Sequence, residues 1–283
     1  MRCCQTQVPS AVAAGASRAG REATREQEPP SAASRPAPPV GKRIILPATF
    51  GGCPRDLHQC YLDAMTIVAK FGRPDFFITM TANPNWEEIK KNLRPWETAA
   101  DRPDLVARVF RRKLDALMRD LTQHGVLGKA VAYTKVVEFQ KRGLPHAHIL
   151  LIVRSCDKPK TPADVDRLVS AEVPDRAADH ELYRLVEQCM VHGPCGALNP
   201  TCPCMTELGQ CSKFFPKAYR TETELNVGGY PAYKRRQLFP PAGAGDRAPP
   251  DRWVSRTLNR GRQDSAWVVP YNAYLLTKYQ WRP

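Results

Sequence analysis

The sequence lacks several features that would assign it to large classes of proteins. Among its 283 residues, no apolar run approaches the roughly 20 residues that a transmembrane helix needs, and no segment has the charged start, apolar middle and small-residue end of a secretory signal. No G-x-x-x-x-G-K-[ST] loop occurs, so the sequence predicts no nucleoside triphosphate site and no ATP-driven unwinding. The 10 cysteines are too few for a disulfide framework in so long a chain. We therefore expect a soluble, intracellular protein with no membrane partner, whose clustered cysteines bind metal.

Acidic side chains are scarce relative to basic ones. Lys and Arg number 42 against 28 Asp and Glu, which gives a formal net charge of +14, and the apolar fraction of 42% is ample for a core. Such a positive balance favours a polyanionic partner, and nucleic acid is the first candidate. The alternative is that the excess of Arg only keeps the surface soluble.

The first part of the chain differs in composition from the rest. Residues 1–42 are rich in Ala, Pro, Arg and Ser without apolar periodicity. They cannot bury enough surface to order themselves, so we expect a disordered leader. We expect the remainder to divide into a core over residues 43–190, a Cys- and His-rich segment over 191–220, and a basic part over 221–283.

Hydrophobic periodicity predicts both helices and strands in the core. Over residues 101–124, apolar side chains recur at helical spacing, and Asp101 is the expected N-cap. A further helix is expected to follow Thr161, which can cap it. The β-rich run 74–81 ends at an Asn-Pro turn signal and predicts a central strand.

A hairpin is the strongest local prediction. Two strand-like runs, 129–139 and 144–153, are joined by only four residues, so they can pair only as antiparallel neighbours. Successive strand residues point to opposite faces, so His146 and His148 project to the same side. The sequence thus predicts two converging imidazoles at the start of an otherwise apolar strand.

The residues opposite these histidines predict a cation site. Glu138 and Gln140 share a face, and either can approach the imidazoles as a third ligand. A mixed nitrogen and oxygen set with open positions suits Mg²⁺ or Mn²⁺ held against a phosphate. Lys141 and Arg142, at the tip of the hairpin, are expected to bind phosphate. The alternative is a half-buried strand whose polar positions happen to be His.

The segment VVEFQKRGLPHAHILL resembles the His-hydrophobic-His signature of HUH endonucleases, in the form carried by the Rep domain of Helitron rolling-circle transposons. Further segments resemble the Helitron helicase-like N-terminal region in the expected order: IILPATFGG, FGRPDFFITMTANPNWEEI, RPDLVARVFRRKL, VDRLVSAEVPD, MVHGPCG, CSKFFPK, GGYPAYKRR and WVVPYNAYLLTKY. The resemblance covers roughly Arg43 to Tyr279. It departs from the family at Ala82, where a Cys is usual; we interpret this as a packing change.

The resemblance implies an α+β fold in which a central antiparallel sheet with flanking helices carries the histidines, followed here by a Cys-rich, loop-rich C-terminal extension. Family members nick single-stranded DNA: a tyrosine attacks the scissile phosphate, while the ion bound by the histidines orients that phosphate. The family's two tyrosines lie four residues apart on a helix. Tyr274 and Tyr279 are five apart, about 140° around a helix, so they are weak candidates, better suited to packing. We expect a chain truncated before the catalytic tyrosines.

A second cluster of metal-binding residue types lies in CMVHGPCGALNPTCPCMTELGQC. A His-x₂-Cys knuckle followed by two spaced thiols can close a tetrahedral Zn²⁺ site. We expect four ligands: His192, Cys195, Cys204 and Cys211. Cys202 or Cys189 can replace any one of these four, and the alternative is a loop with free thiols.

Positive charge concentrates between Ser212 and Pro283, where basic residues outnumber acidic ones. We expect Lys234, Arg235 and Arg236 to contact single-stranded DNA. The alternative is a solvated basic surface.

The leading interpretation is a Helitron-like Rep endonuclease domain that binds single-stranded DNA and a divalent cation in the nucleus. Strand nicking and transfer in rolling-circle transposition is its ancestral reaction. The alternative is a catalytically inactive, zinc-stabilised DNA-binding module derived from a transposon. A third possibility, a metal-dependent nuclease that uses activated water, needs only the histidines and Glu138.

Overall fold

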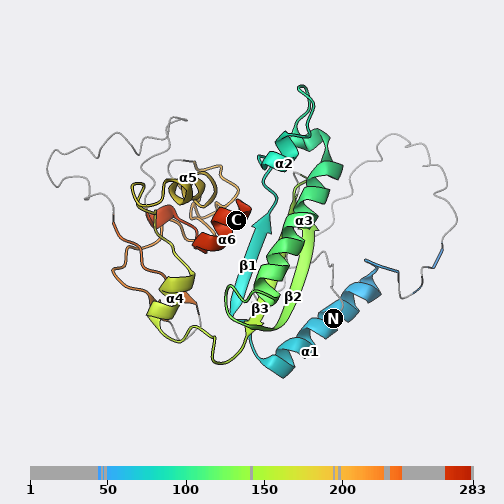
Figure 1. Ribbon diagram of the computed structural model, residues 1–283, viewed down its shortest axis with the longest axis horizontal. Coiled ribbons are helices and arrows are strands. Elements are labelled where there is room, and N and C mark those ends of the chain that lie inside the picture. Colours follow the sequence, from blue (N-terminus) through green and yellow to red (C-terminus); the bar gives the residue numbers. More distant parts are fainter. Residues whose placement is uncertain are drawn as a thin grey trace, which may run out of the picture.

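The chain folds as a small antiparallel sheet with helices packed on and beside it (Figure 1). The computed structural model describes residues 44–281 except 46, 48–49, 141–142, 194, 197–198, 226–229 and 238–264. The predicted leader, residues 1–42, lies outside the described residues. The mixture of helices and antiparallel strands confirms the expected α+β class.

Within the part of the chain that the structure describes, the sheet contains three strands: β1 (Phe76–Thr81), β2 (Ala130–Phe139) and β3 (Pro145–Val153). The order is β1-β3-β2 with both pairings antiparallel, which confirms the predicted hairpin. The prediction that 74–81 forms a central strand is wrong, because β3 is central and β1 lies at an edge. Phe76 and Ile78 of β1 instead pack against the apolar core and line a cavity together with Leu275 of the C-terminal helix.

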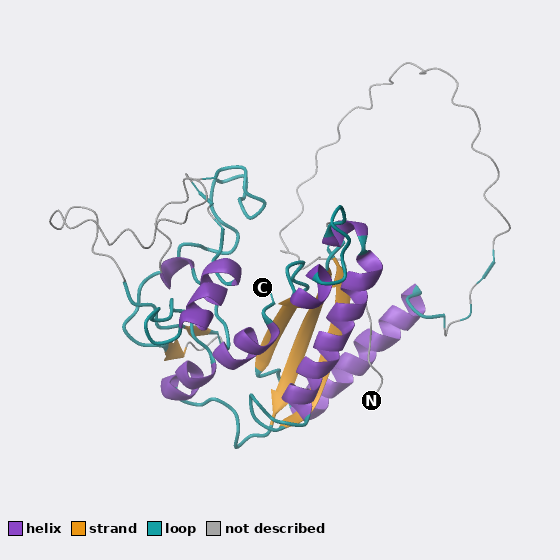
Figure 2. Cartoon of the chain, turned by 45° about the horizontal axis from the view of Figure 1, so that its top comes forward, coloured by secondary structure: helices purple, strands orange, loops and turns teal. Residues whose placement is uncertain are grey.

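Helix α3 (Pro103–Thr122) lies along one face of the sheet (Figure 2). Its apolar stripe packs in the same core as the strands. The predicted helix is confirmed, and its buried residues recur every three or four positions: Val106, Phe110, Leu114, Leu117, Met118 and Leu121. The prediction of Asp101 as N-cap is wrong. Arg102 holds that position, because the Asp101 carboxylate already accepts hydrogen bonds from the backbone N–H and hydroxyl of Thr98.

The remaining elements flank the sheet. Residue bounds are α1 (Pro54–Phe71), α2 (Glu87–Lys90), η1 (Ala99–Asp101), α4 (Pro162–Leu168), α5 (His180–Cys189), β4 (Glu224–Leu225), β5 (Pro231–Ala232), η3 (Ser265–Trp267) and α6 (Ala273–Tyr279). Thr161 caps α4 as predicted, in a reciprocal capping box with Asp164. Sequence periodicity did not predict α1, α5 or α6.

The C-terminal helix belongs to the same core as the sheet. Leu275 and Leu276 of α6 are buried in one apolar cluster with Ile149 of β3 and Leu114 of α3. In Figure 1, α6 lies beside β1 and next to α5, with which it packs. Among the described residues, no helix is both long and apolar enough to cross a membrane.

Candidate metal centres

Two histidines of β3 lie on the face of the sheet opposite α3. Ala147 and Ile149, which alternate with them along the strand, are fully buried in the core that α3 completes. His146 and His148 therefore project from the other face. Their ring centroids are 4.4 Å apart and the rings meet edge to face, at 74°. The two imidazoles thus converge within one short segment of strand.

Glu138 completes a group of three potential ligands. It lies directly opposite His146 in the β2–β3 ladder, and its Oε1 is 3.1 Å from Nε2 of His148. One ligand atom from each of Glu138, His146 and His148 lies within 4.8 Å of the other two. The Glu138 and His148 side chains are about one-third exposed, so the group can be reached from solvent.

Thr81 fixes the orientation of His146. Its Oγ1 lies 2.6 Å from Nδ1 of His146, at the position on β1 that pairs with this histidine. Nε2 of His146 is therefore the nitrogen left for a ligand, as in sites where a neighbouring group orients a metal-binding ring. Burial, and then the neighbouring His148, lower the pKa of His146, although Glu138 acts in the opposite direction. The net lowering favours the neutral ring, the form that binds cations.

One atom of the group is left without a partner. Nδ1 of His148 is buried and makes no hydrogen bond to any described residue. A buried nitrogen in this state costs about 1–3 kcal/mol unless water or another group satisfies it. A carboxylate, a neutral imidazole and this incompletely satisfied ring together fit a divalent cation with open coordination positions.

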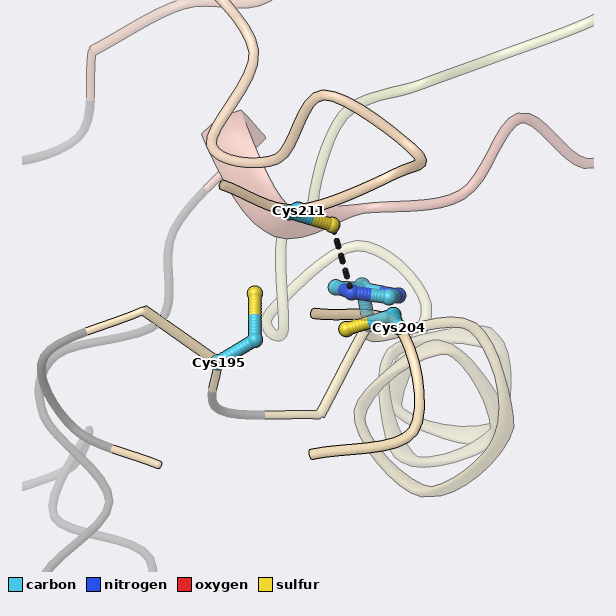
Figure 3. A group of neighbouring side chains, drawn as sticks. Cys195, Cys204 and Cys211 are labelled. Carbon is cyan, nitrogen blue, oxygen red and sulfur yellow. Dashed lines mark hydrogen bonds between the residues drawn. The ribbon is translucent and has the colours of Figure 1, made fainter. Parts of the chain in front are cut away.

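The cysteine-rich segment forms a second group. One ligand atom from each of four residues lies within 4.8 Å of the others: His192, Cys195, Cys204 and Cys211. Figure 3 shows the three thiols around one small space, with Cys211 joined to the imidazole of His192 at 3.5 Å. Three sulfurs and one imidazole nitrogen form a closed four-ligand set, which can hold a metal and is compatible with Zn²⁺.

The two alternative thiols lie differently. Cys202 contacts the group from outside, with its Sγ 3.4 Å from that of Cys204. Cys189, at the end of α5, is buried in the apolar core. The imidazole of His192 stacks on Phe215 at 4.3 Å and lies 6.4 Å from Trp267. The group and its neighbouring rings therefore join the segment after α5, the loop that carries Cys211 and Phe215, and the segment that carries Trp267.

Residues 13–151 match a family model, described as the Helitron helicase-like domain at the N-terminus. The chain contains a Helitron helicase-like domain. The match begins earlier than the resemblance from Arg43 onward, inside the predicted leader, and ends within β3. A search of curated proteins finds no match.

The matched segment of the Helitron-like domain contains Glu138, His146 and His148, whereas the cysteine group follows it. Gln140, the other expected oxygen ligand, is exposed one residue beyond the end of β2. Lys141 and Arg142 lie outside the described residues.

The two tyrosines of α6, Tyr274 and Tyr279, differ in exposure and in hydrogen bonding. Tyr279 is 3% exposed and its hydroxyl donates a hydrogen bond of 2.7 Å to Asp120 of α3. Burial and then this hydrogen bond raise the pKa of Tyr279 well above its ordinary value, which opposes formation of a nucleophilic phenolate. Tyr274 is 51% exposed, and its hydroxyl accepts a hydrogen bond from Lys278. The two tyrosines therefore lie in different environments.

The three basic residues expected to contact DNA also differ in exposure and in the partners of their side chains. Arg235 is 4% exposed, and its Nη1 donates hydrogen bonds to the carbonyls of Ala171, Ser265 and Val268. Burial lowers its pKa to about 10. We exclude Arg235 from the DNA surface, because its guanidinium is buried and already hydrogen-bonded to backbone carbonyls. Arg236 is exposed but paired with Glu172, and Lys234 is half-buried.

Sequence reasoning missed Thr81 and Asp120. Thr79 and Thr81 alternate with apolar residues in the FFITMT run, and this polar face of a strand could have indicated Thr81. The contacts of Asp120 with α6 had no such signal, because Lys278 lies 158 residues away along the chain.

Proposed function

We propose that this Helitron-like domain binds single-stranded DNA and holds Mg²⁺ or Mn²⁺ at Glu138, His146 and His148, where a phosphodiester is positioned for strand nicking. The observation that carries the proposal is the convergence of one carboxylate and two imidazoles on the sheet face opposite α3. The formal net charge of +14 supports a polyanionic substrate. The context would be rolling-circle transposition in the nucleus.

The charge and the ligand atoms of the site suit the binding of a phosphate. A bound Mg²⁺ or Mn²⁺ would polarise the phosphorus centre and stabilise the leaving oxygen. Glu138 supplies the only negative charge of the group, so a divalent ion there keeps a net positive charge toward the DNA. Thr81 holds His146 so that Nε2, and not Nδ1, is available.

The proposal leaves Tyr274 as the α6 tyrosine that could act as nucleophile. The Tyr279 hydroxyl is buried and engaged by Asp120. Tyr274 is exposed, and its hydroxyl accepts a hydrogen bond from Lys278.

A second candidate function is a catalytically inactive DNA-binding module held together by Zn²⁺. The four-residue group around His192 favours it, since three thiolates and a neutral imidazole are a typical structural zinc set. Burial, followed by the charges of Lys213 and Lys217, lowers the pKa of His192, which favours the neutral imidazole. The zinc would stabilise the C-terminal part in both candidate functions.

One assay separates the candidates. The protein is incubated with a labelled single-stranded oligonucleotide and Mn²⁺, and the products are separated under denaturing conditions. A denaturant-resistant protein–DNA adduct that is lost in Tyr274→Phe supports the tyrosine mechanism. Cleavage without an adduct indicates activated water, and binding without cleavage indicates the inactive module.

The double variant His146→Ala/His148→Ala tests the cation site itself. We expect it to lose all cleavage and to keep most of its DNA affinity, because contacts of Lys and Arg side chains with phosphates supply much of the free energy of DNA binding. Equal loss of affinity and cleavage contradicts this separation of roles.

A further inference from the structure

We propose that Phe77 is a nucleobase-binding residue that stacks on a base next to the phosphate held at the cation site. This inference rests on the proposed function and adds a base contact to it. Phe77 belongs to β1 and is 64% exposed, although large apolar side chains in strands are usually buried. An aromatic ring kept in solvent beside a candidate site is a ready surface for stacking.

The register of the sheet places Phe77 beside the cation group. Side chains alternate along β1, so Phe77 shares a face with Thr81, which contacts His146. The rings of Phe77 and His148 are nearly parallel, at 6°, with centroids 5.5 Å apart. The exposed phenyl ring is thus stacked with a ring of the cation group.

A base of single-stranded DNA is the occupant that fits these observations. The chain carries a net charge of +14, which attracts a phosphate backbone to its surface. A base adjacent to a phosphate held by Glu138, His146 and His148 would lie within reach of the ring that contacts His148. Every base presents a π-face, so this contact would be largely independent of sequence.

The experiment compares two ligands of equal charge: an oligothymidylate and an abasic oligomer with the same number of phosphates. Their affinities are measured by fluorescence anisotropy with Mn²⁺ present. For the wild-type protein we expect tighter binding of the oligothymidylate. Phe77→Leu should weaken that ligand by roughly 5- to 150-fold and leave the abasic oligomer unchanged, whereas Phe77→Trp should retain the preference.

Phe139→Leu is the matched control. Phe139 is 56% exposed at the end of β2, and because it follows Glu138 it points to the opposite face of the sheet. We expect it to keep the wild-type preference for bases. An equal loss in the Phe139 variant would indicate a general aromatic effect and overturn the assignment of Phe77.

Mn²⁺ binding without DNA, followed by electron paramagnetic resonance, tests the structural alternative. If Phe77 only holds His148 in place, Phe77→Leu will weaken Mn²⁺ as much as DNA, and the proposal is overturned. If wild-type protein binds neither Mn²⁺ nor DNA, the proposed function fails as well. If it binds both but shows no preference for bases, only the role of Phe77 fails.

Discussion

The hydroxyl of Tyr279 should stabilise the fold and take no part in DNA chemistry. Tyr279→Phe removes one oxygen and keeps the ring, which packs against Trp281 with centroids 5.8 Å apart. The lost interaction is a 2.7 Å hydrogen bond to the buried carboxylate of Asp120.

The magnitude follows from the partners of Asp120. A hydrogen bond to a charged group contributes about 1.5–3 kcal/mol. Asp120 keeps Lys278 at 2.7 Å and His124 at 2.9 Å, so its charge stays compensated and the loss should be near the lower limit. We expect the free energy of unfolding to fall by about 1.5–2 kcal/mol, measured by urea denaturation.

Tyr274→Phe is the control for this measurement. The Tyr274 hydroxyl is at an exposed position, so its removal should change the free energy of unfolding by less than about 0.5 kcal/mol. Unchanged stability in Tyr279→Phe would refute the structural role of the hydroxyl. Loss of a DNA adduct in that variant, with stability intact, would instead identify Tyr279 as the nucleophile.

Three further predictions address the two candidate metal centres and Asp120. Thr81→Val should lower Mn²⁺ affinity about 10- to 100-fold, because His146 loses the group that orients it; unchanged affinity by electron paramagnetic resonance would show that the strand alone positions the ring. Cys211→Ser should abolish zinc binding, measured by metal analysis of the purified protein, while Cys202→Ser should retain it; equal loss in both would mean that the ligand set is wrong. Burial raises the pKa of Asp120, but its hydrogen bonds, led by that from Lys278, outweigh this and lower it below the ordinary value of 3.8. The stabilisation by Asp120 should therefore be complete above about pH 4 and decline as the pH falls through the lowered pKa. Urea denaturation of wild type and Asp120→Asn should show that the difference between their free energies of unfolding shrinks as the pH falls. A constant difference would contradict the assignment.

Local patterns predicted the elements that carry the first candidate site. The short link between residues 139 and 144 permits only an antiparallel hairpin, and the period of two in a strand puts His146 and His148 on one face. The same reasoning placed Glu138 across from them. These predictions needed no knowledge of the remaining fold, because every residue involved lies within one continuous stretch of chain.

Other predictions failed because packing between distant segments decided them. The apolar composition of β1 indicated a central strand, but β3 lies between β1 and β2, and β1 lines a cavity together with a helix from the other end of the chain. The charge of Arg235 indicated a DNA contact, but three backbone carbonyls enclose its guanidinium. Composition indicates what a side chain can bind, but it does not indicate which segment of the chain will pack against that side chain.

The sequence by itself determined the hairpin, the α3 stripe and the ligand types of both candidate centres, since periodicity and spacing act over a few residues. Only the tertiary structure decided that Thr81 orients His146, that Phe77 stands exposed beside His148, and that Asp120 engages Tyr279. Each of these contacts joins residues more than 60 positions apart. Such pairs meet only when the core brings their elements together, and no local pattern specifies that meeting.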